Sequence, residues 1–190
     1  MSKHFNATHY ENIPAFPKNG DKSERVVHAV METVKGSSHK FALQSEFGII
    51  WLKESLPDGM TWPYDYGFIP QTVGDDGDPI DVLYLVDAPT FPGCMVKARL
   101  LGAFRMKKNG VENDRLIGAA MPAVGRTQST DRYHELADLS PQLLEEIERF
   151  LVTYSTAQGN TIEVLGRVNA REAMGLVKSA RKKFQKNGAH

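Results

Sequence analysis

The residues with the clearest chemical potential are three aspartates in one short turn. Asp76, Asp78 and Asp81 lie within six residues of one another, separated by Gly77 and Pro79, and a hydrophobic segment follows them directly. Carboxylates this close repel one another, and each like charge raises the pKa of its neighbours. A cation held between them would remove that cost. Oxygen ligands with no histidine or cysteine nearby favour a hard ion such as Mg²⁺, Mn²⁺ or Ca²⁺ over zinc.

Three interpretations of this turn compete. The first is a solvent-exposed hairpin turn, since Asp, Gly and Pro are common turn residues. The second is an EF-hand calcium loop starting at Asp76, but this register puts Asp81 where glycine is required and Asp87 where glutamate is expected, so it fails. The third is a catalytic magnesium site, in which a few carboxylates hold ions that water and substrate phosphates complete. This third interpretation requires phosphate-binding residues elsewhere in the chain.

Candidate phosphate-binding residues lie in three other segments. Residues 35–40 carry two lysines around a small-residue turn, and residues 62–70 carry two tyrosines just before the acidic turn. Residues 113–115 combine an amide, an acid and a guanidinium. Each segment also has an ordinary structural explanation, as solvated lysines, core aromatics or the exit of a hairpin. The first and the third interpretation of the acidic turn therefore both stay open on composition alone.

The elements that would position these groups change character along the chain. Strands are predicted over residues 25–34, 40–46, 49–53, 67–72, 80–86, 95–106 and 115–121, the second and third of these forming a hairpin. Ser140-Pro141 then predicts the start of an amphipathic helix that carries Tyr154. After a strand over 161–165, Asn169 with Glu172 resembles a capping box that opens a second helix. Strands followed by helices indicate an α+β fold, mainly β, with a small barrel or sandwich as its body.

Length and composition fit one domain. The chain has 190 residues, and single domains run to roughly 100–200 residues. Its 41% hydrophobic and 24% charged residues are ordinary for a globular protein. Pro14, Pro17 and Gly20 interrupt any regular pattern near the start. We therefore expect an irregular N-terminal arm over residues 1–24 and one domain over residues 25–190.

Composition and charge also argue against several classes of protein. No apolar run approaches the roughly 18 residues that a membrane span needs. The N-terminal residues show no hydrophobic signal core, and the single Cys94 cannot form an intrachain disulfide, so a cytoplasmic location is predicted. With 23 basic and 23 acidic residues the chain lacks the basic excess of a general nucleic-acid binder. No membrane or nucleic-acid partner is expected.

In their order along the chain, these residues resemble the soluble family I inorganic pyrophosphatases. The segment Tyr66-Gly67-Phe68-Ile69-Pro70, followed by Asp76-Gly77-Asp78-Pro79-Ile80-Asp81, is similar to that family's signature. Glu32 with Lys35-Gly36-Ser37 and Lys40 resembles its substrate-binding stretch, and Tyr154 lies late in a helix, as a family tyrosine does. The resemblance spans about residues 26–165. It implies a five-stranded closed β-barrel of the OB type with flanking helices.

The resemblance also implies a reaction, the Mg²⁺-dependent hydrolysis of pyrophosphate to two orthophosphates. Several Mg²⁺ ions would take part, with Mn²⁺ as an alternative, and an activated water would attack phosphorus. Asp76 and Asp81 would be metal ligands, with Asp114 and Glu32 as further acids of the metal and water network. Asp78 would accept a proton from the attacking water. Lys40, Tyr66, Arg115 and Tyr154 would hold the phosphate oxygens. The resemblance also implies that the protein forms a homo-oligomer.

At several positions the sequence departs from the family's pattern. Acids are expected at Ala42, at Asn113 beside Asp114, and around Lys108-Asn109; an arginine is expected at Glu54, a tyrosine at Trp62 and a lysine at Ser155. These substitutions leave the number of metal ions, their affinity and the release of product open. They also support a second hypothesis, a diverged homologue that has reduced activity or acts on another phosphoanhydride.

A third hypothesis is an OB-type nucleic-acid module without enzymatic activity. The basic C-terminal helix, with six basic residues and one acid from Arg171 onward, favours it. The acidic window opposes it, because Glu54 to Val96 contains eight acids and no lysine or arginine. Such a surface repels a nucleic-acid backbone unless metal ions neutralise it.

Overall fold

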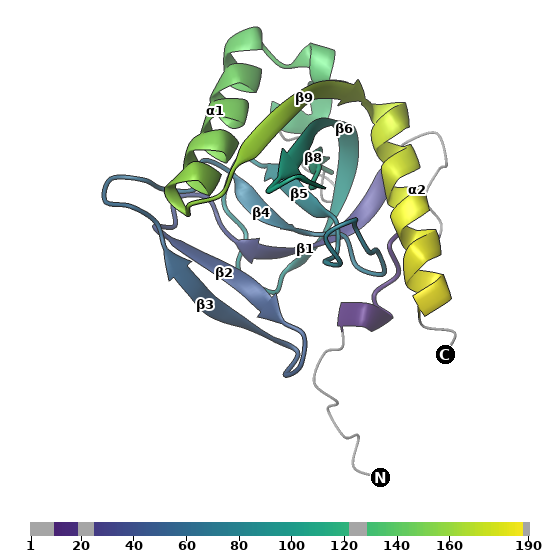
Figure 1. The fold of residues 1–190 in the computed structure, drawn as a ribbon. Coiled ribbons are helices and arrows are strands. Elements are labelled where there is room, and N and C mark those ends of the chain that lie inside the picture. Colours follow the sequence, from purple (N-terminus) through teal and green to yellow (C-terminus); the bar gives the residue numbers. More distant parts are fainter. Residues whose placement is uncertain (1–9, 19–24, 122–128, 188–190) are drawn as a thin grey trace.

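The strands of the chain curl into a ring that two helices flank, as the computed structural model shows for residues 10–18, 25–121 and 129–187 (Figure 1). The strands are β1 (Val26–Thr33), β2 (His39–Gln44), β3 (Ile49–Ser55), β4 (Asp65–Phe68), β5 (Asp81–Leu85), β6 (Met95–Lys108), β7 (Val111–Glu112), β8 (Arg115–Ala120) and β9 (Ile162–Asn169). The α-helices are α1 (Pro141–Ala157) and α2 (Ala170–Asn187), and the 3₁₀ helices are η1 (Tyr10–Asn12), η2 (Ser129–Arg132) and η3 (Leu136–Asp138).

Five strands make the ring. The order of pairing is β1–β4–β5–β8–β6, and β6 pairs back with β1. Only the pair β5–β8 is parallel, and the other four pairs are antiparallel. Closing the ring leaves no free edge among these five strands. The predicted α+β, mainly β fold with a five-stranded OB-type barrel and flanking helices is confirmed.

Strand β6 can close the ring because it is long. Its 14 residues pair first with β1, over Met95–Arg99, and then with β8 and β9. A register shift between Leu100 and Gly102 lies where the strand changes partners. Such irregularities increase the local bend and twist of a strand. The ring therefore depends on one bent strand that serves two neighbours in turn.

The two helices begin where the sequence predicts. At α1 the Ser140 hydroxyl accepts a hydrogen bond from the Leu143 N–H at 3.2 Å, and Pro141 occupies the first helical position. At α2 the side chains of Asn169 and Glu172 each accept a bond from the other's backbone N–H, at 3.0 and 3.2 Å. These bonds satisfy donors that a helix start leaves free. The predicted N-cap and capping box are both confirmed.

Each helix covers a different face of the strands. Ile147 and Leu151 of α1 join the core cluster that contains Leu83, whereas Val177 of α2 joins the cluster that contains Val82. Because neighbouring residues of a strand point to opposite faces, this alternation places the helices on opposite sides of β5, as Figure 1 shows. No helix among the described residues is both long enough and apolar enough to span a membrane.

The predicted strand over residues 67–72 is wrong at both ends, because β4 covers Asp65–Phe68. It starts earlier because Asp65 already pairs with Tyr84 of β5, and its buried carboxylate accepts hydrogen bonds from the backbone N–H groups of Lys35 and Thr90, both at 2.8 Å. It ends earlier because Pro70 has no N–H to pair, and Gln71 turns the chain at a φ of 56°. The short strand β7 was not predicted at all.

The predicted arm over residues 1–24 lies partly outside the described residues. Within it, residues 10–18 pack against the barrel, and Ala15 is fully buried. The Ala15 carbonyl accepts a hydrogen bond from the His28 N–H at 2.9 Å, and the His28 ring bonds the Pro14 carbonyl at 2.7 Å. This part of the arm is attached to β1. The division into an arm and a domain over 25–190 stays a prediction.

Candidate functional site

The acidic turn opens onto a cavity of about 380 Å³. The cavity lies between the β2–β3 hairpin, the turn that follows β4, and the first residues of β5 and β8. Seven of the nine predicted site residues line it: Glu32, Lys40, Tyr66, Asp76, Asp78, Asp81 and Arg115. The remaining two, Asp114 and Tyr154, do not. The fold thus gathers residues from five strands and one turn around a single cavity.

Asp81 and Arg115 form an ion pair in the part of the cavity lined by the acidic turn. The two residues are paired in register at the start of the parallel strands β5 and β8. Arg115 Nη1 lies 2.8 Å from Asp81 Oδ2, and both side chains are mostly buried. Arg115 also donates to the backbone carbonyls of Asn113 and Asp114, both at 3.2 Å. The guanidinium is therefore fixed in place with one carboxylate already on it.

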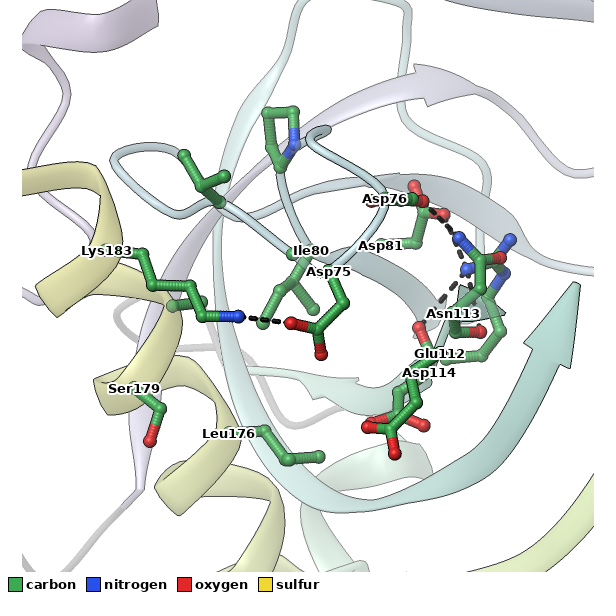
Figure 2. Close-up of a pocket in the computed structure, with 15 residues that line it drawn as sticks. Asp75, Asp76, Ile80, Asp81, Glu112, Asn113, Asp114, Leu176, Ser179 and Lys183 are labelled. Carbon is green, nitrogen blue, oxygen red and sulfur yellow. Dashed lines mark hydrogen bonds and ion pairs between the residues drawn. The ribbon is translucent and has the colours of Figure 1, made fainter. Parts of the chain in front are cut away.

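Asp76 faces its own set of donors on the other side of the turn. Its carboxylate accepts hydrogen bonds from the Asn113 side-chain amide and, at 3.1 Å, from the Asp78 N–H. Figure 2 shows Asp76, Asp81 and Asn113 converging beside one another. Burial raises the pKa of Asp76, and the negative charges of Asp81 and Asp78 raise it further. The hydrogen bond from the Asp78 N–H lowers this pKa but does not cancel the rise. The predicted repulsion among the three carboxylates therefore appears as a raised pKa of Asp76.

Lys40 supplies a cation from the opposite wall. Its ammonium lies over two aromatic rings, 5.2 Å from the centre of Tyr154 and 5.9 Å from that of Tyr66. Such cation–π contacts stabilise an ammonium that has left water. Burial lowers the pKa of Lys40, and the positive charges of Lys53 and Arg115 lower it further, whereas Asp81 raises it. Several positive charges thus act on Lys40, as expected where an anion binds.

Glu32 is the most deeply placed acid of the cavity, with 8% of its surface exposed. One carboxylate oxygen accepts a 2.7 Å hydrogen bond from the Leu43 N–H. Burial raises the pKa of Glu32 to about 7, although that hydrogen bond and the charges of Lys40 and Lys53 oppose the rise. The group can therefore hold or release a proton near neutral pH.

Tyr154 lies behind the cavity lining and contacts the site through its ring, over which the Lys40 ammonium lies. Its hydroxyl donates to Glu54 Oε1 at 2.6 Å and accepts from the Gln158 side chain at 2.7 Å. Burial, and then the hydrogen bond to Glu54, raise the pKa of Tyr154 above its ordinary value. Trp62 packs beside it with ring centres 4.9 Å apart. Its predicted role as a phosphate donor stays a prediction, and the two protein partners of the hydroxyl do not favour it.

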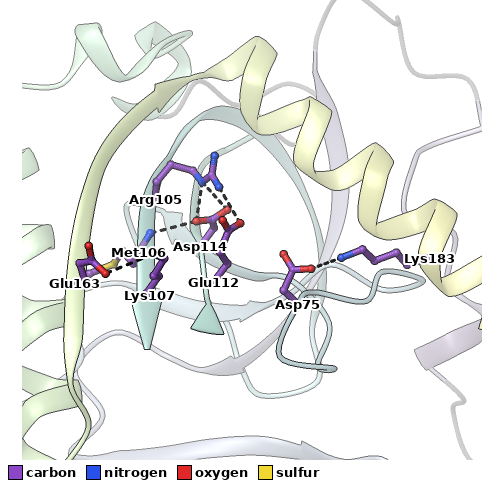
Figure 3. A network of polar contacts seen from close by, with 8 residues as sticks. All are labelled: Asp75, Arg105, Met106, Lys107, Glu112, Asp114, Glu163 and Lys183. Carbon is purple, nitrogen blue, oxygen red and sulfur yellow. Dashed lines mark hydrogen bonds and ion pairs between the residues drawn. The ribbon is translucent and has the colours of Figure 1, made fainter. Parts of the chain in front are cut away.

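Asp114 points away from the cavity. Its carboxylate binds Arg105 Nε at 2.8–2.9 Å and accepts from the Met106 N–H at 3.2 Å, a network that Figure 3 shows. Asp114 instead lines a smaller cavity of about 80 Å³ between the acidic turn and α2, where Lys183 binds Asp75. The predicted role of Asp114 as a metal ligand stays a prediction that this geometry does not support.

The donor set around the cavity suits a divalent cation of the hard type. The carboxylates of Asp76, Asp78, Asp81 and Glu32 all line it, and none of the described lining residues is a histidine or a cysteine. Across the described ranges, however, no three histidine, cysteine or acidic side chains are close enough to share an ion. Asp81 and Asp76 are turned to Arg115 and Asn113 instead. Binding an ion would require these two carboxylates to exchange partners.

The cavity also has lining residues that the sequence did not point to. Tyr10 and Glu11 of η1, which belong to the N-terminal arm, form part of its wall. Lys53 and Lys108 add two ammonium groups. No local pattern marks Tyr10, Glu11 or Lys53, because only the packing of the arm and the pairing of β3 bring them to the cavity. Lys108 lies where the family resemblance expects an acid, so the resemblance pointed to its position but not to a lysine. Asn113 stands where the family pattern expects an acid, and in the structure its side-chain amide lines the cavity and donates a hydrogen bond to Asp76.

Comparisons with known proteins agree with this arrangement. A family model described as inorganic pyrophosphatase matches residues 29–185. An inorganic pyrophosphatase of Haloferax volcanii is 34% identical over 90% of this chain and 94% of its own length. One of Halalkalibacterium halodurans is 36% identical over 80% of this chain and 91% of its own length.

Solved structures give the same result. The inorganic pyrophosphatase of Thermus thermophilus superposes with a TM-score of 0.79 at 32% identity, over 92% of this chain and 99% of that one. The inorganic pyrophosphatase of Neisseria gonorrhoeae superposes with a TM-score of 0.82 at 26% identity, over 93% and 99% of the two chains. The likeness therefore covers more than nine-tenths of this chain.

Proposed function

Because this chain belongs to the inorganic pyrophosphatase family, we propose that it hydrolyses pyrophosphate to two orthophosphates with Mg²⁺ as its divalent cofactor. The observation that carries the proposal is the single cavity in which Lys40 and Arg115 face Asp76, Asp78 and Asp81. Lys40 on one wall and Arg115 beside Asp81 on the other suit an anhydride of two phosphates, and the carboxylates suit the ions that accompany it.

The residues of the cavity divide into two groups by charge. Lys40, Arg115 and the Tyr66 hydroxyl are donors for phosphoryl oxygens, and they stabilise the negative charge that the departing phosphate gains. Asp76, Asp81 and Glu32 would hold the divalent ions. Bound there, such ions would neutralise the substrate and lower the pKa of water. Asp78, which is exposed and lines the cavity, would accept the proton that water gives up as the P–O–P bond breaks.

A phosphate-release assay tests the proposal directly. Pyrophosphate is offered with Mg²⁺, with Mn²⁺ and with EDTA, and released orthophosphate is measured against time. We expect turnover with Mg²⁺ and none with EDTA, because the carboxylates alone would repel the substrate. Absence of Mg²⁺-dependent release would contradict the proposal.

The same assay separates the second candidate, a diverged homologue acting on another phosphoanhydride. The observation in its favour is Glu54, whose carboxylate holds the Tyr154 hydroxyl at 2.6 Å and so removes one donor from the substrate. A nucleoside triphosphate offered in parallel should be hydrolysed more slowly than pyrophosphate. A faster rate with the triphosphate would favour the second candidate.

The predictions of a homo-oligomer and of a cytoplasmic location stay predictions. Light scattering after size-exclusion chromatography would test the first, since a homo-oligomer must give a mass that is a whole multiple of the chain's mass. A monomer mass would contradict it.

A further inference from the structure

The strand pairing of the β2–β3 hairpin contains an irregularity beside the cavity. Lys40 pairs with Glu54, and the next residue, Phe41, pairs with Leu52. Lys53 is therefore an extra residue on β3, and Lys53 and Glu54 together oppose Lys40. A bulge of this kind re-aims a side chain, and bulges are common next to active sites.

The bulge changes the direction of the Lys53 side chain relative to its neighbour on β3. In a regular strand, neighbours such as Lys53 and Glu54 point to opposite faces. Here Lys53 lines the cavity, as Lys40 does, while the Glu54 carboxylate is held by the Tyr154 hydroxyl. Among the residues that the structure describes, Lys53 makes no ion pair. A free ammonium thus stands on the wall that already carries Lys40.

We propose that Lys53 is a substrate-binding residue, which the bulge turns into the cavity beside Lys40 so that both ammonium groups hold phosphoryl oxygens. The inference rests on the proposed function and adds a ligand to it. Electrostatics agrees with the geometry, because the positive charge of Lys53 lowers the pKa of both Lys40 and Glu32. The two ammonium groups repel each other, and a phosphate anion bound between them would attract both.

The test compares Lys53→Met with a matched control, Lys107→Met. Lys107 also lies on a strand near the cavity, but its ammonium is 3.6 Å from Glu163 and does not line the cavity (Figure 3). For Lys53→Met we expect KM for pyrophosphate to rise about tenfold, as for the loss of one hydrogen bond between charged groups. The kcat should change less than about twofold, since Lys53 holds substrate and transition state alike. Lys107→Met should leave both constants unchanged.

Further measurements make the result specific. The effect of Lys53→Met should shrink as KCl is raised, because salt screens an exposed charge, and Lys53→Arg should retain most of the affinity. Binding of methylenediphosphonate, a non-hydrolysable analogue, is measured by calorimetry in the presence of Mg²⁺, and Lys53→Met should weaken it by the same factor as KM. Circular dichroism of each variant checks that the barrel is intact.

The outcomes separate this inference from the proposed function. If the unaltered protein binds and hydrolyses its substrate but a folded Lys53→Met protein does so with the same KM, Lys53 is not a ligand and the proposed function stands. If the unaltered protein neither hydrolyses pyrophosphate nor binds the analogue, the proposed function fails and the inference fails with it. An equal rise in KM for Lys107→Met would also overturn the assignment, because the effect would then be one of net charge.

Discussion

Asp78 is the residue on which the proposed chemistry depends most directly. It lies in the exposed part of the acidic turn and also lines the cavity, so it is open to water and would lie beside a substrate bound there. We expect Asp78→Asn to lower kcat by about 100-fold or more, which is typical for the loss of a general base. The free energy of unfolding should change by less than about 0.5 kcal/mol, since the site is exposed. Phosphate release and urea denaturation measure the two effects.

The neighbouring Asp75 provides the control for that substitution. Asp75 belongs to the same turn, but its carboxylate binds Lys183 of α2 and does not line the larger cavity (Figure 2). Asp75→Asn should therefore retain turnover within about twofold, because exposed ion pairs contribute little. Full activity in Asp78→Asn would show that another group takes the proton.

Glu32 should make the metal-free protein sensitive to pH. Its pKa is about 7 in the folded chain against an ordinary value of 4.5, because burial disfavours the charge. Between these two values the folded state binds a proton that the unfolded state has lost, so the free energy of unfolding falls as pH rises. The full effect is at most about 3 kcal/mol. In EDTA, Glu32→Gln should therefore stabilise the protein at pH 8 and have little effect at pH 4.

Urea denaturation at both pH values measures this difference. Glu46→Gln is the matched control, because Glu46 lies in the exposed turn of the β2–β3 hairpin. An equal gain at pH 8 for both variants would mean that general surface charge is responsible and not the buried carboxyl.

At the scale of single residues, the sequence predicts what is local. Asp76, Asp78 and Asp81 could be found because they are close together in the chain and resemble a family signature. Lys53 could not, since its direction depends on a bulge in a pairing with β2. Asp65 could not either, because its carboxylate is satisfied by backbone groups 25 and 30 residues away.

At the scale of elements, the tightest constraint is the approach of β4 to β1 at Gly67. A methyl group added at Gly67 would overlap the carbonyl oxygen of Val30 on the neighbouring strand. We expect Gly67→Ala to lower the free energy of unfolding by about 2–3 kcal/mol, because the two strands must separate to admit the side chain. Chemical denaturation measures the loss, and activity should fall with it, since β4 carries Tyr66.

Gly175 gives the opposite result for the same substitution. It lies inside α2, and nothing stands within 4 Å of the position that a methyl group would take. Gly175→Ala should therefore stabilise the protein by about 1 kcal/mol through helix propensity alone. Destabilisation by both variants would show that the strand contact at Gly67 is not the cause.

Elements with strong end signals could be predicted, and those defined by pairing could not. Ser140-Pro141 and Asn169 with Glu172 mark both helix starts, because capping uses residues adjacent in sequence. The limits of β4 and the existence of β7 depend on partners elsewhere in the chain, and both were missed. The hairpin of β2 and β3 lies between these cases: its strands were predicted, and its bulge was not.

At the scale of the whole molecule, the ring of strands explains why distant segments share one cavity. Strand β1 pairs with β4 on one side and with β6 on the other. Strand β8 pairs with β5 and β6, so Arg115 comes to lie beside Asp81. The order of predicted strands and helices favours a barrel or sandwich but does not fix the order of strand pairing, because the pairings join residues far apart in sequence. The family resemblance, and not the alternation of residues, supplied the barrel as an expectation.

A closed barrel should also report metal binding through its overall stability. If Asp76 and Asp81 hold a divalent ion in the folded state only, Mg²⁺ at about 100 times its dissociation constant adds about 2.7 kcal/mol to the free energy of unfolding. For a chain of this length, that corresponds to a rise in Tm of roughly 5–10 °C. Thermal denaturation followed by circular dichroism, with MgCl₂ compared against KCl of equal ionic strength, measures the shift.

The double variant Asp76→Asn, Asp81→Asn makes that shift diagnostic of the cavity. It removes the carboxylates that would exchange Asn113 and Arg115 for the ion, so the Mg²⁺-dependent rise in Tm should disappear. Without Mg²⁺, replacing Asp76 should stabilise the fold slightly, because its raised pKa reflects burial and like charges that an amide does not share. Asp75→Asn should keep the full shift, since its partner is Lys183. A Mg²⁺ effect of equal size in the double variant would place the ion elsewhere on the molecule, and the acidic turn would then be an ordinary exposed turn.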